Sequence, residues 1–532
     1  MEFDLVIAGM GPVGAVAANL AGQFGLRALV LEKSLTVFEK PRAMGFDHEV
    51  MRIFGNLGIA EKIAPFVMPY RPSEYRNAAG QLLRHINTAS APFALGWAPN
   101  YVFLQPQVEA ALRENLNRFP CVTVELGAEV LSVASNESGA STTVRFASGE
   151  ERAIHSSHVL ACDGGTSPIR TQLRLDMEDL DFDEPWLVVD VILKEGGGQS
   201  LPTTNVQYCE VERPATFVVG PGQVRRWEFM INPGEAPAEV AQPEFVRSLI
   251  RRWLNDDEYE IWRASTYRFH ALVLRDWRAG NIFFLGDAAH MTPPFLAQGM
   301  CQGIRDAANL MWKLALVKQG HAASSLLDTY QLERAPHVRA TTLVTKGLGK
   351  DICERDAERA RERDERLLGE TALTPSGTIR QSLIPGLADG LLSSLSEGPR
   401  GVLFPQPLVR APNGKQGLLD EFTGTTFRVV VYGVSDGREL EQIQQECSKL
   451  GALALQLVVI TRRGEVVAGL SDFYEDLDGA LTEWMRVREC AVAVVRPDHY
   501  IFGAMRDVWE GVQIIPELRH LLQGETEECA HG

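Results

Sequence analysis

The sequence predicts an α/β fold in which a parallel sheet is built first, a β-rich stretch interrupts it, and a separate α/β unit follows. Three observations predict this: a strand, glycine loop, helix and strand open the chain, β-type runs fill the middle, and a β-α-β…β-β-α order closes it. The 532 residues exceed the roughly 250–300 that one core serves. We therefore expect a first domain over 1–175 and 276–370, an insertion over 176–275, and a last domain over 371–532.

The opening unit has the pattern of a dinucleotide site. An apolar run over 3–8 leads into Gly-x-Gly-x-x-Gly, an Ala-rich helix follows, and a second strand over 27–31 ends at an acid. The first glycine makes a tight turn, the second lets backbone approach a pyrophosphate, and the third lets the helix pack on the strand. The helix N-terminus faces the phosphates, and the acid binds a ribose diol. The candidate residues of this unit are Gly9, Gly11, Pro12, Gly14, Glu32 and Lys33.

Two later segments also place glycines and a carboxylate where a strand ends. Residues 160–165 read Leu-Ala-Cys-Asp-Gly-Gly, and the strand 282–285 runs into Gly-Asp-Ala-Ala-His and then a glycine-rich helix start. A carboxylate there can accept a hydrogen bond from a sugar-alcohol hydroxyl, and the free N–H groups of the helix start suit an electron-rich ring edge. Three separated segments around one ligand fit a long, bent dinucleotide such as FAD. The candidates that they add are Asp163, Gly164, Asp287, Pro293, Pro294, Gly299 and Met300.

In order and spacing, the three segments resemble the fingerprints of the FAD-dependent aromatic-ring hydroxylases, the single-component group related to p-hydroxybenzoate hydroxylase and phenol hydroxylase. The resemblance covers residues 1–345, and 41–43 and 225–230 are most similar to the 3-(3-hydroxyphenyl)propionate hydroxylase branch. It implies a Rossmann-like FAD-binding domain, an inserted β-rich substrate domain and a C-terminal thioredoxin-like domain. The absence of Cys-x-x-Cys agrees with a last domain that is not redox active and that supports folding or homodimer contacts.

The resemblance also implies a reaction. NADH or NADPH would pass hydride to the flavin, the reduced flavin would take O2 to form a C4a-hydroperoxide, and the distal oxygen would be transferred to a phenolic ring such as that of 3-(3-hydroxyphenyl)propionate. No second complete nucleotide fold is present, because Gly220–Gly222 lies between β-type segments. We therefore expect the nicotinamide to bind transiently, and no residue distinguishes NADH from NADPH.

The resemblance assigns roles around the flavin residue by residue. It places Glu32 at the adenosine ribose and the Gln298–Met300 backbone at the N1–C2=O edge, where N–H groups would favour the anionic reduced ring. Asp163 would lie near both FAD and the nicotinamide path. The remaining assignments are Arg42 at a phosphate and beside the ring, Gln105 and Asp287 at the ribityl region, and Pro293 and Pro294 at the ring face.

The substrate side is less defined. His48 is a candidate base, because a phenol with a pKa near 10 must lose its proton to activate the ring; a solvent-facing helix residue is the alternative. Arg225 or Arg226 could bind a substrate carboxylate, or be ordinary strand arginines. His290 is either near the ligand or a buried, hydrogen-bonded core residue. The catalytic candidates are His48, Pro293, Arg225 and Tyr208.

Composition limits the partners. The net charge of −17 argues against nucleic acid and an anionic membrane surface. Eight scattered cysteines, without a Cys/His cluster, predict free thiols and no metal site. No basic leader precedes the first apolar run and no segment is long enough to span a membrane, so we expect a cytoplasmic enzyme whose partners are an aromatic substrate and O2.

Other functions remain open. A flavin-dependent halogenase is weakened by the absence of Trp-x-Trp-x-Ile-Pro, and a prenyl-chain reductase by a middle segment too polar for a long apolar channel. A polyketide-tailoring oxygenase stays an alternative. A non-catalytic flavin-fold escort protein would lose the Gly-Asp pair that 286–287 retains.

Overall fold

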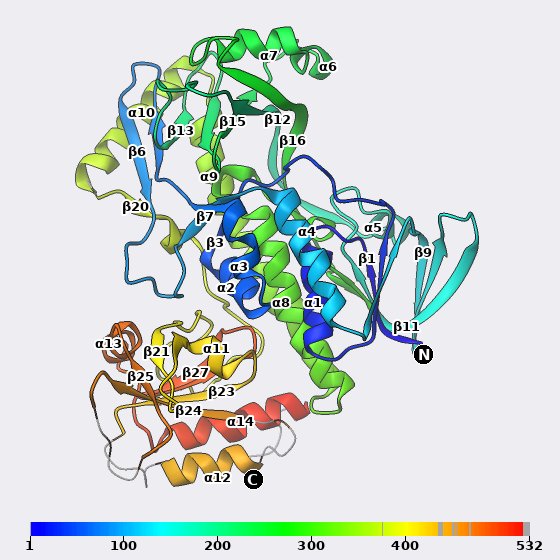
Figure 1. Ribbon diagram of the computed structural model, residues 1–532, viewed down its shortest axis with the longest axis vertical. Helices are drawn as coiled ribbons and strands as arrows, with labels where there is room; N and C mark the ends of the chain where they lie inside the picture. The colour runs from blue at the N-terminus through cyan, green and yellow to red at the C-terminus, as the bar shows by residue number, and fades with distance from the viewer. Residues whose placement is uncertain are drawn as a thin grey trace.

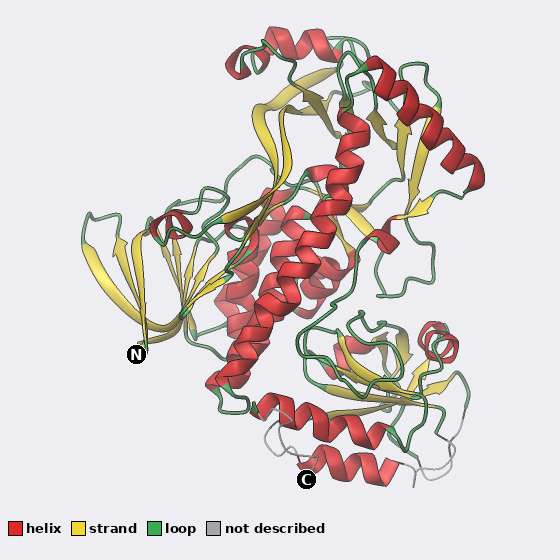
Figure 2. Cartoon of the chain, turned by 180° about the vertical axis from the view of Figure 1, so that it is seen from behind, coloured by secondary structure: helices red, strands yellow, loops and turns green. Residues whose placement is uncertain are grey.

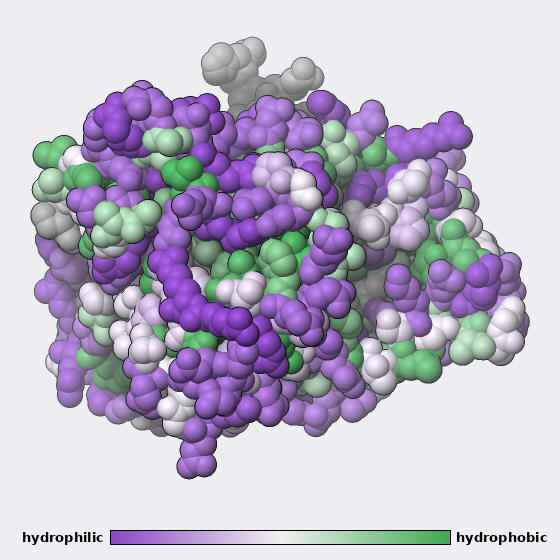
Figure 3. All heavy atoms as spheres, turned by 90° about the horizontal axis from the view of Figure 1, so that it is seen from above, coloured by the Kyte–Doolittle hydropathy of each residue, from purple (hydrophilic) through white to green (hydrophobic). Residues whose placement is uncertain are grey.

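The computed structural model describes residues 2–524 except 375, 435–439, 450–452, 454, 466 and 468–469. Three parts surround a long helix, α8 (Gly299–Lys318): a parallel sheet beside it, a large second sheet towards one end of the molecule, and the C-terminal unit at the other end (Figures 1 and 2). Most of the surface visible from above is hydrophilic, with smaller apolar patches between the polar side chains (Figure 3).

The parallel sheet is built from apolar strands that helices cover. Its order is β17-β18-β11-β1-β2-β8, and the hairpin of β9 and β10 extends it beside β11. Every residue of β1 after Phe3 is buried, as expected for a strand with both faces covered. The strands are β1 (Phe3–Ala8), β2 (Ala28–Glu32), β8 (Val122–Leu126), β9 (Glu129–Asn136), β10 (Gly139–Arg145), β11 (Glu151–Ala161), β17 (Arg278–Ala279) and β18 (Ile282–Phe284).

Helices and a small sheet complete this part. A three-stranded sheet, β3-β7-β4, lies beside α2. Residues 101–103 belong to β7, and the helix α4 starts at Gln105. These elements are α1 (Pro12–Gln23), β3 (Gly45–Asp47), α2 (His48–Asn56), α3 (Ala60–Ile63), β4 (Val67–Pro69), β7 (Asn100–Phe103), α4 (Gln105–Asn115), α5 (Pro168–Gln172), α9 (Thr329–Cys353) and α10 (Ala357–Leu373).

The second sheet has the order β19-β16-β12-β15-β14-β13-β5-β6-β20. Its centre lies in the expected insertion, but β5, β6, β19 and β20 come from outside 176–275. One face packs on the main core through Trp186 and Met230, and the other packs under α6 (Pro237–Val240) and α7 (Pro243–Ile250). The strands are β5 (Ser73–Arg76), β6 (Leu82–Asn87), β12 (Met177–Leu193), β13 (Asn205–Tyr208), β14 (Ala215–Val219), β15 (Val224–Met230), β16 (Tyr259–Leu274), β19 (His290–Met291) and β20 (Thr378–Ile379).

The C-terminal unit has the thioredoxin-like order that the sequence predicted. β23 pairs in parallel with β24 and antiparallel with β26, and β26 pairs antiparallel with β27. Residues 504–505 end β27, and the last helix begins at Gly511. The elements are β21 (Leu408–Arg410), β22 (Gln416–Leu418), α11 (Leu419–Thr423), β23 (Arg428–Tyr432), α12 (Glu441–Lys449), β24 (Gln456–Arg462), β25 (Tyr474–Asp476), α13 (Ala480–Val487), β26 (Val492–Val495), β27 (Ile501–Met505) and α14 (Gly511–Gln523).

A buried charge cluster joins α2 to the C-terminal unit. The Asp420 carboxylate accepts hydrogen bonds from Arg52 Nε at 2.6 Å and from Arg428 Nη1 at 2.9 Å, and all three side chains are fully buried. Asn56 Nδ2 lies 2.7 Å from a ring nitrogen of His499. The helix that carries His48 at its first position is thus fastened to the last domain through its later residues.

Other sequence-based expectations concern cysteines and membranes. All seven cysteines in the described part of the chain are free, and Cys529 lies outside it. None of the described helices is long and apolar enough to cross a membrane.

Candidate flavin and substrate site

The three glycine-containing segments meet at one edge of the parallel sheet. Ala8 of β1 lies opposite Ala161 of β11, and Ala161 lies opposite Phe284 of β18, so the strands end together. Gly9 has φ +96°, and a Cβ there would come within 3.0 Å of the carbonyl oxygen of Cys162. The turn after β1 therefore needs glycine both for its conformation and for its contact with the second segment.

The helices behind this edge are equally tightly packed. A Cβ on Gly14 would come within 3.0 Å of the Gly9 carbonyl oxygen, and one on Gly303 would lie 2.8 Å from the Gly286 Cα. A Cβ on Gly11 would meet no protein atom within 4 Å. Gly14 and Gly303 thus close the helix–loop contacts, whereas Gly11 leaves open space at the N-terminus of α1, where Pro12 is the first helical residue.

Two carboxylates around this space have oxygen atoms that accept no hydrogen bond from the described chain. One Asp163 oxygen accepts a hydrogen bond from Ile169 N at 3.1 Å, while its buried Oδ1 has no donor among the described residues. Burial raises the pKa of Asp163. The Asp287 side chain is exposed at the surface of this space, and desolvation by the surrounding protein raises its pKa. No group in the described chain donates a hydrogen bond to it. These unpaired acceptors fit the hydroxyls of a ribityl chain, so the residues present fit FAD.

Glu32 is the last residue of β2, at the same edge of the sheet. Its carboxylate accepts hydrogen bonds from Met10 N and from Ser34 N, each at 2.8 Å. The side chain is buried and links the glycine loop to the end of β2, with acceptor capacity left for a diol. Lys33 is exposed beside it.

The loop that carries Arg42 is held by two residues on its neighbours. Gln105 Oε1 accepts hydrogen bonds from the backbone N–H groups of Arg42 and Ala43, at 2.9 and 2.7 Å. Arg226 donates to the carbonyl oxygen of Arg42 at 2.9 Å and pairs with Asp190 at 2.7 Å. Arg226 therefore anchors this loop and is already paired, which does not support the suggestion that it binds a substrate carboxylate. The Arg42 side chain itself is exposed.

Two predicted substrate residues lie on the opposite face of the second sheet. Because side chains alternate along a strand, Arg225 points away from the face of Arg226, and its guanidinium donates to the carbonyl oxygens of Gly222 and Val224. Tyr208 packs beneath α7, and its hydroxyl accepts a hydrogen bond from Trp253 Nε1 at 3.0 Å. Side chains on neighbouring strand positions point to opposite faces, so Arg225 and Tyr208 lie on the face under α6 and α7, away from Arg226 and the 41–42 loop. Neither placement supports a role beside the flavin.

The segment after Asp287 turns towards the start of α8. Pro293 is buried, Pro294 starts a short 3-10 turn, and Ala297 has φ +50°. No side chain caps the N-terminus of α8, where Gly299 and Met300 are half-buried, so the first N–H groups of the helix remain free. Free N–H groups at a helix N-terminus can stabilise negative charge on a bound ligand.

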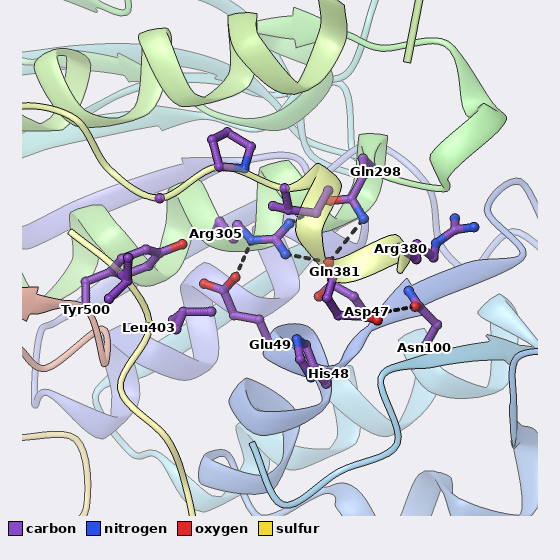
Figure 4. A pocket seen from close by; sticks show the side chains of 14 residues that line it. Asp47, His48, Glu49, Asn100, Gln298, Arg305, Arg380, Gln381, Leu403 and Tyr500 are labelled. Atoms are coloured by element: carbon purple, nitrogen blue, oxygen red, sulfur yellow. Dashed lines mark hydrogen bonds and ion pairs between the residues drawn. The ribbon is translucent and has the colours of Figure 1, made fainter. Parts of the chain in front are cut away.

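A polar cavity of about 190 Å³ lies beside this turn (Figure 4). Arg305 bridges the carboxylates of Asp47 and Glu49 in it, and Gln298 donates to Asp47 at 3.1 Å. Burial opposes ionisation of Asp47, but Arg305 outweighs it and lowers the pKa of Asp47; burial raises the pKa of Glu49. The lining residues are Asp47, His48, Glu49, Asn100, Gln298, Arg305, Arg380, Gln381, Ile384, Pro385, Gly386, Val402, Leu403 and Tyr500.

The two candidate histidines differ. His48 lines the cavity, its ring has no hydrogen bond within the described chain, and burial lowers its pKa to about 4. His290 is fully buried, with Nε2 2.7 Å from Asp306 and its ring stacked on Trp277. Of the two interpretations of His290, the structure favours the buried, hydrogen-bonded core residue.

Two buried clusters of charged side chains were not predicted from the sequence. One is Arg305 with Asp47 and Glu49; the other is Arg226 and Arg263 with Asp190 beneath the 41–42 loop. The signal for the first was an arginine on the apolar start of α8, which must have partners if it is buried. The partners lie some 250 residues away in the chain, at positions 47 and 49, and only the fold brings them together.

Comparisons with known proteins identify matching families and relatives. The FAD binding domain family matches residues 2–345, and the HcaD C-terminal domain family matches 401–511. A probable NADH-specific resorcinol 4-hydroxylase of Rhodococcus jostii is 35% identical over 97% of this chain and 94% of that protein. A 3-(3-hydroxy-phenyl)propionate/3-hydroxycinnamic acid hydroxylase of Burkholderia vietnamiensis is 31% identical over 99% of this chain and 98% of its own length.

Solved structures show the same fold. The flavin-dependent monooxygenase PieE, in complex with FAD and substrate, aligns with a TM-score of 0.82 over 99% of this chain and 100% of its own, at 19% identity. The chain belongs to the family of FAD-dependent aromatic-ring hydroxylases. It is accordingly an NAD(P)H-dependent flavoprotein monooxygenase with FAD as its cofactor.

Proposed function

We propose that this enzyme hydroxylates a phenolic aromatic compound with NADH or NADPH and O2. The observation that supports this most is the meeting of three glycine-containing loops at one sheet edge, with the unpaired acceptors Asp163 and Asp287 and the second sheet close by. Relatives are named for resorcinol and for 3-(3-hydroxyphenyl)propionate, so a monocyclic phenol is the proposed substrate class.

The chain's residues would hold FAD along its length. Gly11 leaves room for the pyrophosphate, Glu32 takes the adenosine ribose, and Asp287 takes the ribityl hydroxyls. When bound, FAD supplies hydride acceptance and oxygen activation. The uncapped N–H groups of Gly299 and Met300, with the positive end of α8, stabilise negative charge at the pyrimidine edge.

His48 is the proposed partner of the phenol hydroxyl. With a pKa of about 4, its imidazole is neutral at pH 7 and can accept a hydrogen bond. The gap to a phenol pKa near 10 makes full proton transfer to His48 unfavourable. We therefore assign it polarisation of the hydroxyl, and not storage of its proton.

The proposed cellular location and partners follow from composition and charge. The net charge of −17 and the free cysteines support a cytoplasmic enzyme without a nucleic-acid partner. A homodimer with contacts through the C-terminal unit stays a prediction, which light scattering on the purified enzyme would check. The Asp287 carboxylate, retained and unpaired, argues against a non-catalytic escort protein.

The test is a panel of phenols with the purified holoenzyme. We expect a yellow protein whose NADH or NADPH consumption is stimulated by resorcinol or 3-(3-hydroxyphenyl)propionate, with a product of one added oxygen by mass spectrometry. Gly11→Val, which should not bind FAD, is the control for free-flavin chemistry. Consumption without a hydroxylated product for every phenol tested would overturn the proposal.

A further inference from the structure

Arg380 is a buried arginine without a counter-ion. It is 4% exposed, no carboxylate of the described chain lies within 4.0 Å of it, and its Nε has no hydrogen-bond partner. Every other buried arginine in the described residues has a carboxylate within that distance. Those eight are Arg52, Arg226, Arg263, Arg305, Arg334, Arg363, Arg428 and Arg496.

The position of Arg380 is fixed by its neighbours in the chain. It follows β20, which extends the second sheet by pairing with β6 at Ile86 and Asn87. The next residue, Gln381, donates to Asn100 Oδ1 at 2.6 Å and accepts from Ala89 N at 3.1 Å. The guanidinium carbon lies 4.8 Å from the centre of the Tyr70 ring. The fold therefore holds this charge in place and covers one of its sides.

The nearby carboxylates are used elsewhere. Arg380 lines the polar cavity with Asp47 and Glu49, but both carboxylates are bound by Arg305. In Figure 4 the Arg380 guanidinium points away from them. A buried, unpaired cation is costly, and a bound anion would relieve that cost.

We propose that Arg380 binds the carboxylate of an aromatic acid substrate, a phenol with a short acidic side chain. This rests on the proposed function and deepens it. The planar guanidinium can donate two parallel hydrogen bonds to a carboxylate, which a neutral diol cannot match. Arg380 directly follows β20, the edge strand of the second sheet, and is not part of the three glycine-containing loops, which favours substrate over the anionic reduced flavin as its partner. Acids such as 3-(3-hydroxyphenyl)propionate are therefore preferred to resorcinol.

The test uses Arg380→Met and Arg380→Lys in the full-length FAD enzyme. For 3-(3-hydroxyphenyl)propionate, Met should raise KM roughly tenfold to a hundredfold, and Lys should restore part of the loss. The KM for resorcinol should change less than about threefold. Arg268→Met, which removes an exposed arginine of the same sheet, is the matched control and should leave both values unchanged.

Two further measurements separate the explanations. The thermal midpoint of Arg380→Met without ligand should equal or exceed that of the parent, because no native ion pair is lost; a clear decrease would indicate a structural arginine and overturn the proposal. Equal losses for acid and diol would point to the flavin and also overturn it. If the parent turns over neither phenol, the proposed function fails, and the anion site is tested alone by titrating the enzyme with 3-phenylpropionate and following the flavin absorbance. Binding that is lost in Arg380→Met would support the anion site. Binding that does not depend on Arg380, or no binding at all, would overturn it.

Discussion

Replacement of Asp420 by Asn should strongly destabilise the joint between α2 and the C-terminal unit. The carboxylate is fully buried and accepts hydrogen bonds from Arg52 at 2.6 and 2.9 Å and from Arg428 at 2.9 Å. Asn keeps the shape but removes the charge, so two buried guanidinium groups lose their counter-ion. Removing one partner of a buried ion pair costs about 3–5 kcal/mol.

That free energy converts to a measurable shift. One kcal/mol changes the midpoint of a domain of this size by roughly 2–4 °C, so a decrease of roughly 6–20 °C is expected. Differential scanning calorimetry of the FAD-loaded enzyme would measure it, with the thermal transition of the C-terminal unit followed separately. Glu483→Gln, which breaks an exposed ion pair with Arg486 in the same unit, should leave the midpoint unchanged. A shift of Asp420→Asn no larger than that of the control would refute the argument.

The same carboxylate predicts a pH dependence with a definite sign. Although burial opposes ionisation, Arg52, His499 and Arg428 hold the pKa of Asp420 well below 3.8. A group whose pKa is lowered on folding stabilises the native state above its unfolded pKa, and this stabilisation is lost as the pH falls through the folded value. The midpoint difference between parent and Asp420→Asn should therefore be constant from pH 5 to 7 and shrink below about pH 4. A difference that grows on acidification would contradict this.

Three predictions concern the site. Gly11→Val should abolish FAD binding without lowering the thermal midpoint of the FAD-free protein. Gly14→Val should abolish FAD binding and also lower that midpoint, because its side chain would collide with the Gly9 carbonyl oxygen. Equal midpoints of the two FAD-free variants would contradict this. Asp287→Ala should raise the FAD dissociation constant, measured by flavin fluorescence, roughly tenfold or more. An unchanged dissociation constant would show that the carboxylate does not contact the cofactor. His48→Gln should lower kcat by a factor that is the same from pH 6 to 8, since the imidazole titrates at about 4; a factor that changes midway would show titration in that range.

The sequence predicted those parts of the molecule that depend on local pattern. The strand ends at Ala8, Ala161 and Phe284 could be located because buried strands and glycine turns have short-range signatures. The order of strands and helices in the C-terminal unit followed for the same reason. The contribution of β5 and β6 to the second sheet could not be predicted, because β13, which pairs with β5, lies more than a hundred residues later, and β6 joins the sheet through β5.

The substrate-binding residues could not be predicted, because their assignment depends on strand register and burial, which the sequence alone does not give. Arg225 and Arg226 are neighbours with the same chemistry, and which of them faces the flavin domain depends on the register of β15. The burial of Arg380 could not be predicted, because a single arginine in a short connecting segment carries no sequence signal of being buried. Its significance comes from the absence of a partner, which only the assembled structure reveals.

The mixed origin of the second sheet bears on how such enzymes can be recombined. A chimera made by exchanging 176–275 with a relative would transplant β12 to β16 but keep the native β5, β6 and β20 along one margin. The donor's β13 would have to pair in parallel with a foreign β5, and Arg380 would remain from the recipient. To exchange the aromatic preference, three separate segments, 73–87, 177–274 and 378–381, therefore have to be exchanged together.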